Sequence, residues 1–355
     1  MKKALVTGAA GFIGSHVVDQ LTTMGVEVRA SALPNENTDN IEHCNPEIVR
    51  GDMLDKGFVK EIVEGVDTVF HLAAIYATWL PDWKPLWEVN LQGSRNMLWA
   101  CMNADNIQKV VYTSSLSAIG LLPGKASSNE TTPFNQYDAL PYILSKYLSQ
   151  QEALDFAEQG LNLTVVNPAF PFGPGDVAPT PTGGIILKMI EGGARFSFPG
   201  GFNLVDVRDV AAGHILAAEK GKQGEIYILG NENVSGEEFS KMCAEILGKS
   251  DRVIPLPGLL VEGGAQLAQF IAENITHSKP YINPKELKYT SQYAYMDCSK
   301  ARKELGYNPR DVRISLRDSI AWFQSEQFQK RQNNAMPLKA SESVLCATPS
   351  VLATR

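Results

Sequence analysis

Short apolar runs alternate with amphipathic stretches through the first 170 residues of the chain. The runs are rich in Val, Ile and Thr and end at turn-forming residues, as strands do. The stretches between them carry apolar residues at helical spacing. Because strands separated by helices pair in parallel, and because these runs are apolar throughout, we predict a doubly wound α/β fold with a parallel sheet covered on both faces. The predicted strands are 3–8, 27–33, 47–53, 67–74, 109–115 and 163–169, and the predicted helices are 14–25, 57–65, 89–104 and 142–159.

The regular alternation is lost after residue 171, where glycine and proline become more frequent. We therefore predict a Rossmann dinucleotide-binding region over residues 1–171, with further core elements contributed later in the chain. Residues 172–329 are predicted to form mainly a smaller C-terminal substrate-binding lobe on the same body. Residues 330–355 are polar and aperiodic, which predicts a disordered tail.

Composition narrows the class of protein. A net charge of −7 disfavours nucleic acid as a partner, because phosphate backbones bind basic faces. The five cysteines are scattered without a C-x-x-C pair, so we expect no metal site, no disulfide framework and a reducing compartment. No run approaches the roughly 18 apolar residues of a membrane helix. Thr7 and three glycines interrupt the apolar N-terminal stretch, so we expect no signal peptide. We expect a cytoplasmic protein without a membrane span.

Three glycines separate the first predicted strand from the first predicted helix. Gly8, Gly11 and Gly14 form a G-x-x-G-x-x-G pattern. Such a turn lets a dinucleotide pyrophosphate lie against the free N–H groups of the helix N-terminus. Gly8 permits the turn, Gly11 lets the backbone approach the phosphates, and Gly14 lets the helix pack tightly. We predict a dinucleotide site here that also includes Phe12 and Ile13.

The residues at the ends of the second and third predicted strands do not distinguish NAD from NADP. An acid there would bind the ribose 2′-hydroxyl of NAD, and an arginine the 2′-phosphate of NADP, yet Ala32 and Leu33 are uncharged. Asp52 and Met53 follow the third strand, where Asp52 either accepts a hydrogen bond from the adenine amino group or shapes a turn. We predict NAD or NADP.

Three side chains can perform alcohol–carbonyl chemistry. Tyr142 and Lys146 are four residues apart on one helix face, and Ser115 follows a strand at the sheet edge where doubly wound folds bind ligands. A free phenol has a pKa near 10, and a neighbouring ammonium and a positive nicotinamide ring lower it. We predict that Tyr142 transfers the proton, Ser115 holds the substrate oxygen and the cofactor carries the hydride.

These motifs resemble those of the extended short-chain dehydrogenase/reductases, the epimerase/dehydratase superfamily. The resemblance runs from residue 6 to about residue 310 and is closest to dihydroflavonol 4-reductase-like proteins and hopanoid-associated sugar epimerases. The stretches that carry it are VTGAAGFIGSH, GDMLD, HLAA, VNLQGSRNML, VVYTSS, YILSK, VNPAFPFGPGD, LVDVRDVAAGH and ARKELGYNPR.

The resemblance implies Ser115, Tyr142 and Lys146 as the catalytic set, with Ser114 as the alternative serine. Asn90 matches a helix asparagine that supports the active-site hydrogen bonds, and it could equally be a helix-start residue. The resemblance also implies a homodimer formed through the helices that hold Asn90 and Tyr142. The residues implied to line the cofactor are Leu72, Ala73, Ala74, Tyr142, Lys146, Pro168, Ala169 and Phe170. We expect His71 to be a packed strand-end residue and Asp209 to be a helix N-cap.

The substrate is expected to be a small molecule that meets the loops after the strands. Tyr76 and Trp79 follow the predicted cofactor strand and could wall a flat or apolar substrate, beside Ser115. Arg208 and Arg195 are candidates for holding a charged substrate such as a nucleotide sugar. The segment FNLVDVRDV lacks an arginine at its start, where many epimerases have one, which favours a less charged carbonyl compound.

Three functions are therefore carried forward. The first is an NAD(P)-dependent oxidoreductase that transfers a hydride between the cofactor and a secondary alcohol or carbonyl compound. The second is a nucleotide-sugar epimerase or dehydratase that oxidises its substrate transiently. The third is a non-catalytic dinucleotide-sensing regulator, which the complete Ser–Tyr–Lys set disfavours.

Overall fold

A seven-stranded parallel sheet forms the centre of the computed structural model, which describes residues 1–192, 196–197, 200–249, 254–255 and 291–334. The strand order is β10-β6-β5-β4-β1-β2-β3, with every neighbouring pair parallel. This is a doubly wound order whose direction reverses beside β1, and it confirms the predicted fold class. The strands are β1 Lys3–Thr7, β2 Glu27–Ala32, β3 Glu47–Arg50, β4 Thr68–His71, β5 Lys109–Thr113, β6 Leu163–Pro168 and β10 Ile226–Leu229.

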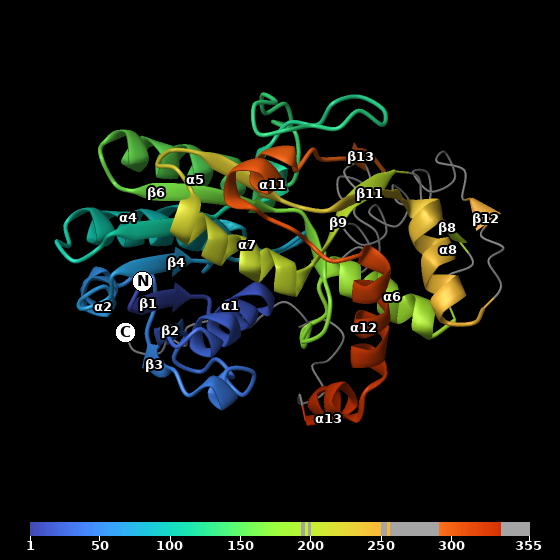
Figure 1. Cartoon of the computed structure of the whole chain (residues 1–355), viewed down its shortest axis with the longest axis horizontal. Coiled ribbons are helices and arrows are strands. Elements are labelled where there is room, and N and C mark those ends of the chain that lie inside the picture. The colour runs from blue at the N-terminus through green and yellow to red at the C-terminus, as the bar shows by residue number, and fades with distance from the viewer. Residues whose placement is uncertain (193–195, 198–199, 250–253, 256–290, 335–355) are drawn as a thin grey trace.

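Helices cover both faces of this sheet, as the continuous apolar strands require (Figure 1). On one face, α1 (Phe12–Thr23) and α7 (Val207–Lys220) bury Val17, Leu21 and Ile215 in a common core. On the other face lie α2 (Lys56–Ile62), α4 (Ser94–Met102) and α5 (Pro141–Glu158). The helix predicted over 89–104 is divided in the structure into a π-helical turn, η2 (Glu88–Gly93), and α4. The short helix α3 (Lys84–Trp87) directly precedes η2.

Later parts of the chain complete the Rossmann sheet and also form a second group of elements. Strand β10 and helix α7 belong to the sheet layer, and α11 (Ser299–Leu305) packs on both. The second group lies to the right of the sheet in Figure 1 and has its own apolar core. Its sheet contains β7 Phe170–Phe172, β9 Gly201–Asp206, β11 Glu232–Ser235 and β13 Tyr293–Ala294. Around it lie α6 Pro181–Ile190, α8 Gly236–Ile246, α12 Val312–Gln324, α13 Glu326–Asn334 and the short pair β8 Phe196–Ser197 and β12 Ile254–Pro255.

Two local predictions are wrong. The disordered tail predicted from residue 330 overlaps α13, which continues to Asn334, while residues 335–355 lie outside the described part of the chain. The N-cap of α7 is Asp206 and not Asp209, because the Asp206 carboxylate accepts from the Arg208 N–H. Asp209 lies in the first turn and instead pairs with Arg310.

No helix in the described part of the chain combines the length and the apolar character that crossing a membrane demands.

Candidate active site

The glycine turn brings the start of α1 very close to the ends of β1 and β4. Gly8 has a φ of +63°, and a Cβ atom there would lie 3.0 Å from the Ala73 nitrogen. A Cβ atom at Gly14 would lie 2.1 Å from the Gly8 oxygen, closer than any side chain tolerates. Thr7 reinforces this contact, because its Oγ1 accepts hydrogen bonds from the Leu72 and Ala73 N–H groups. The turn therefore needs glycine at both positions.

The N-terminus of α1 is open to a phosphate group. Gly11 is its N-cap and no side chain caps the first turn, so the N–H groups of the first turn, including those of Phe12 and Ile13, lack a capping acceptor. Free N–H groups and the positive end of the helix dipole fit a pyrophosphate. Leu72, Ala73 and Ala74 follow β4 directly beside Gly8, where a cofactor on this turn would pass.

His71 is a packed strand-end residue, as expected. Its Nδ1 lies 2.9 Å from Thr7 Oγ1 and its Nε2 lies 3.1 Å from Ser94 Oγ. Burial lowers the pKa of His71 to about 3, and the Lys146 charge lowers it further. The imidazole is neutral and holds β1, β4 and α4 together, so it does not act as the catalytic base.

The structure brings Ser115, Tyr142 and Lys146 together at the carboxyl edge of the sheet. Ser115 follows β5 and caps the 3₁₀ turn η3 (Leu116–Ala118), and its Oγ accepts from the Ser117 hydroxyl at 2.9 Å. Its interaction with the Tyr142 phenol lowers the pKa of that phenol. Lys146 lies one turn further along α5, is buried, and donates through Nζ to the Thr113 carbonyl at 3.1 Å. The alternative serine, Ser114, is buried with no hydrogen-bond partner for its Oγ.

Burial controls the protonation of this group. It raises the pKa of Tyr142 to about 12, and the hydrogen bond with Ser115 opposes that rise only in part. Burial also lowers the pKa of Lys146 to about 8. Desolvation is the largest influence on the phenol, and the prediction that the Lys146 ammonium and the nicotinamide ring together lower the pKa of Tyr142 stays a prediction. The phenol keeps its proton at neutral pH, which is the state that can donate to a carbonyl oxygen.

Asn90 connects the catalytic helix to the loop after β4. It lies in the π-helical turn η2, a type of irregularity that often marks functional sites. Its side chain bonds both the N–H and the carbonyl of Ile75, at 2.7 and 3.0 Å, and donates to Ser145 Oγ at 3.1 Å. Ser145 in turn donates to the Tyr142 carbonyl. Asn90 is thus a member of the network and not merely a helix-start residue.

Two further side chains support the site and were not identified from the sequence. His214 on α7 lies 2.9 Å from Thr113 Oγ1, behind the carbonyl that holds Lys146. Its Nδ1 donates to the Val210 carbonyl, so its Nε2 accepts from the Thr113 hydroxyl. Asn167, at the end of β6, donates to the Ser115 carbonyl at 2.7 Å. A signal for both was present, because Asn167 belongs to the motif VNPAFPFGPGD and His214 to the motif LVDVRDVAAGH.

The remaining predicted residues lie around this centre in different environments. Asp52 forms a turn in which its Oδ1 accepts from the Leu54 N–H, and its contact with adenine stays a prediction. Tyr76 is 48% exposed and packs edge-on against Tyr142, with ring centroids 4.7 Å apart. Trp79 is half-buried in the same loop. Met53 is buried after β3. Pro168 ends β6, Ala169 links the two strands and Phe170 begins β7.

Arg208 is held by carboxylates. Its guanidinium pairs with Asp206 at 2.7 Å and with Asp318 at 2.6 Å, and these partners raise its pKa. A guanidinium paired in this way has little capacity to bind a charged substrate, so its surroundings do not support the substrate contact predicted for it. Arg195 lies outside the described residues.

Comparisons with known proteins agree with this architecture. The model of the NAD dependent epimerase/dehydratase family matches residues 4–230. A Synechocystis protein provisionally named dihydroflavonol 4-reductase is 36% identical over 333 residues, 92% of this chain and 96% of the relative. A Methylococcus capsulatus protein named sterol demethylase protein B is 31% identical over 320 residues, 90% and 97% of the two chains. The crystal structure of gox2253 has a TM-score of 0.81 at 36% identity and covers 91% of this chain and 98% of that one.

The buried ammonium leads to a pH-dependent prediction for Lys146→Met. In the folded chain the pKa of Lys146 is about 8, below its ordinary value of 10.5, so between these values the unfolded chain binds more protons. Wild-type stability therefore gains from rising pH in this window, and the variant lacks that gain. We expect the free energy of unfolding of the variant, relative to wild type, to fall by up to about 3 kcal/mol from pH 8 to pH 10.5.

Denaturant unfolding at several pH values measures this difference. Lys60→Met, at an exposed position on α2, is the matched control for the loss of a lysine charge. A difference for Lys146→Met that stays constant over the whole window contradicts the depressed pKa.

Proposed function

Because the chain belongs to the NAD-dependent epimerase/dehydratase family, we propose that it transfers a hydride between NAD and a carbonyl or secondary alcohol substrate. The chain is an enzyme of the extended short-chain dehydrogenase/reductase type. The observation that carries the proposed reaction is the meeting of Ser115, directly after β5, with Tyr142 and the buried Lys146 on α5, where Lys146 Nζ bonds the Thr113 carbonyl at the end of β5.

Each side chain has a distinct task. The cofactor supplies or accepts the hydride when bound. The Ser115 hydroxyl holds the substrate oxygen, and the Tyr142 phenol gives that oxygen a proton during reduction or takes it during oxidation. The Lys146 ammonium stabilises the phenolate left after proton donation. The Thr113 carbonyl holds Lys146 in place, while Asn90 and Ser145 fix the turn of α5 that carries Tyr142.

The cofactor would lie across the glycine turn and reach this group of side chains. Gly8, Gly11 and the start of α1 would bind the pyrophosphate, and Asp52 with Met53 would border the adenine. Leu72, Ala73 and Ala74 would line the path toward the nicotinamide end. Pro168 ends β6, three strands from β1, and with the next residues Ala169 and Phe170 it would border the nicotinamide itself.

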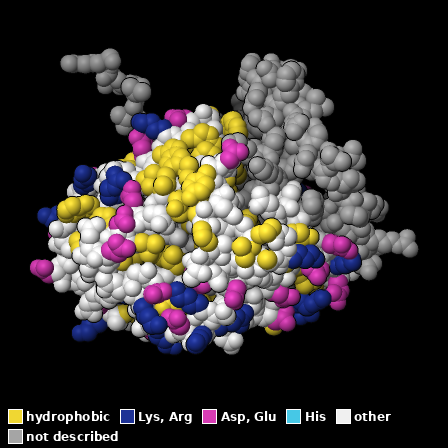
Figure 2. Space-filling view, turned by 90° about the horizontal axis from the view of Figure 1, so that it is seen from above, with side chains coloured by type: hydrophobic (Ala, Val, Ile, Leu, Met, Phe, Trp, Pro, Cys, Tyr) yellow, Lys and Arg dark blue, Asp and Glu magenta, His cyan; other side chains and the backbone are white. Residues whose placement is uncertain are grey.

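An uncharged, largely apolar substrate fits the surroundings of Tyr142 best. The ring of Tyr76 stands against Tyr142, and the segment between β5 and α5 exposes Leu122 and Tyr137. That segment crosses the top of Figure 1, and hydrophobic side chains gather on the face seen from above in Figure 2. Arg208 is engaged by two carboxylates and is not available for a diphosphate. Dihydroflavonol and sterol, the compounds in two relatives' names, are both uncharged ring compounds without a phosphate group.

The proposed chemistry predicts that Tyr142→Phe loses turnover and keeps its fold. Removing the phenol hydroxyl removes the proton donor, and positioned acid–base groups contribute about 10²–10⁴-fold to rate. We expect a loss in that range with dinucleotide affinity nearly unchanged. The assay is nicotinamide absorbance with ketones, aldehydes and nucleotide sugars as substrates.

Tyr147→Phe is the control, because Tyr147 lies on the same helix and stacks on Phe134 through its ring, not its hydroxyl. It should keep full activity. Turnover by Tyr142→Phe within about tenfold of wild type contradicts the assignment of the proton donor. Isomerisation of a nucleotide sugar without net cofactor turnover would instead identify an epimerase.

We further propose a homodimer formed through α4 and α5, the helices next to Asn90 and Tyr142. The two helices pack side by side, and Arg95 joins them through an ion pair with Glu152. Their outer surface exposes Trp99 at 59% and Leu148 at 38%, large apolar side chains that a second copy would cover.

Replacing Trp99 with glutamate tests this surface. A buried charge opposes association, so Trp99→Glu should shift the light-scattering mass from twice the chain toward a single chain. Ile314→Glu, equally apolar and 48% exposed but on α12, should leave the mass unchanged. A wild-type chain that is monomeric, or a dimer indifferent to Trp99→Glu, rules out this interface.

A further inference from the structure

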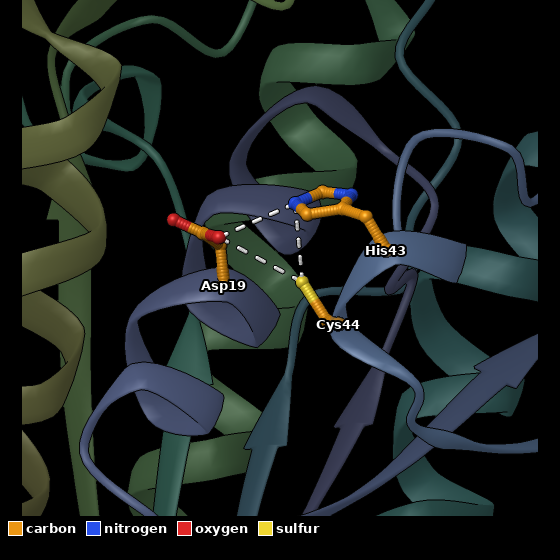
Figure 3. A group of neighbouring side chains, drawn as sticks. All are labelled: Asp19, His43 and Cys44. Atoms are coloured by element: carbon orange, nitrogen blue, oxygen red, sulfur yellow. Dashed lines mark hydrogen bonds and ion pairs between the residues drawn. The ribbon is translucent and has the colours of Figure 1, made fainter.

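Three side chains that can ligate a metal meet on the outer side of α1, away from the catalytic group. Asp19 lies on α1, and His43 and Cys44 lie on the short 3₁₀ helix η1 (Glu42–Cys44) between β2 and β3. Figure 3 shows the carboxylate, the imidazole and the sulfur pointing toward a common centre. The ligand atoms all lie within 4.8 Å of one another.

The distances between these atoms match three corners of a zinc coordination tetrahedron. Zinc lies about 2.3 Å from sulfur and about 2.0–2.2 Å from nitrogen and oxygen, so tetrahedral angles place neighbouring ligand atoms about 3.3–3.6 Å apart. In the structure, His43 Nε2 is 3.3 Å from Asp19 Oδ1 and 3.3 Å from Cys44 Sγ. Cys44 Sγ is 3.7 Å from Asp19 Oδ1. Shifts of a few tenths of an ångström would therefore suffice to bind the ion.

Exposure and charge also suit a cation. The Cys44 side chain lies on the inner side and is buried, whereas the side chains of His43 and Asp19 are 63% and 51% exposed. An ion can enter from solvent, and a water molecule can take the fourth position. A thiolate and a carboxylate together balance the charge of a divalent ion. A sulfur, nitrogen and oxygen donor set at tetrahedral spacing favours zinc over magnesium or calcium, which prefer oxygen ligands.

We infer that Asp19, His43 and Cys44 form a binding site for one zinc ion. The ion replaces the Cys44 thiol proton and joins α1 to η1. Asn40, in the segment leading to η1, donates to the Ala10 carbonyl of the glycine turn, so the joined segment is also the one that contacts the dinucleotide site. The role is structural, because none of the three ligands contacts Ser115, Tyr142 or Lys146 in the described network.

The spacing of the cysteines in the sequence predicts no metal site and gives no sign of this cluster. A C-x-x-C pattern indicates a site built from pairs of cysteines, whereas this cluster has one cysteine, one histidine and one aspartate. Only the packing of α1 against η1 brings Asp19, some 24 positions before His43, to the other two.

Cobalt(II) binding to the full chain, after chelator treatment, tests the site directly. We expect one equivalent to give a sulfur-to-cobalt charge-transfer band and the visible bands of tetrahedral cobalt, with zinc displacing the cobalt. Cys44→Ser should abolish the charge-transfer band. His43→Asn and Asp19→Asn should each weaken zinc binding by about tenfold or more. These two positions are half-exposed, so their substitution leaves the fold intact.

Cys346→Ser is the matched control, since it removes a cysteine remote in sequence from the cluster. It should leave both the band and the affinity unchanged. Three outcomes overturn the site: no charge-transfer band in wild type, a band that persists in Cys44→Ser, or zinc affinity that His43→Asn and Asp19→Asn leave within a few-fold of wild type. Because catalytic turnover is not a readout, the result is independent of the proposed reaction.

Discussion

The close contact between the glycine turn and helix α1 is the constraint on which the site depends. Gly14 lies so near the Gly8 carbonyl that no side chain fits between them, and a Cβ atom at Gly8 would lie 3.0 Å from the Ala73 nitrogen after β4. This crowding presses the N-terminus of α1 onto the carboxyl edge of the sheet. The uncapped N–H groups of the helix are thereby aimed at the edge where β4, β5 and β6 also end.

Desolvation then determines what the side chains at that edge can do. Lys146, His71 and His214 are buried, and burial lowers the pKa of each. Burial raises the pKa of Tyr142, so the phenol keeps its proton at neutral pH. The histidines serve as neutral hydrogen-bonding partners that hold neighbouring elements in place. One phenol and one ammonium are left to move or stabilise a proton, which is the division of tasks that carbonyl reduction needs.

The sequence predicted the first six strands well because β1, β4, β5 and β6 are buried on both faces, which leaves a continuous apolar pattern. The edge strand β3 is only partly buried. It did not place β10 in the same sheet, since Ile226–Leu229 joins β6 from a distant part of the chain. The glycine turn and the Ser–Tyr–Lys set could be predicted because each depends on local spacing. The partners of Arg208, the His214 contact and the Asp19–His43–Cys44 cluster could not, because each depends on packing between elements far apart in sequence.

The most direct test of the central claim is a crystal structure of the chain with bound dinucleotide. The pyrophosphate should lie on the first turn of α1 beside Gly11, and the nicotinamide ring should lie within reach of the Tyr142 hydroxyl. A nicotinamide ring remote from Tyr142, or a phenol turned away from it, would contradict the assigned chemistry. The glycine turn would then be evidence only for the binding of a phosphorylated ligand.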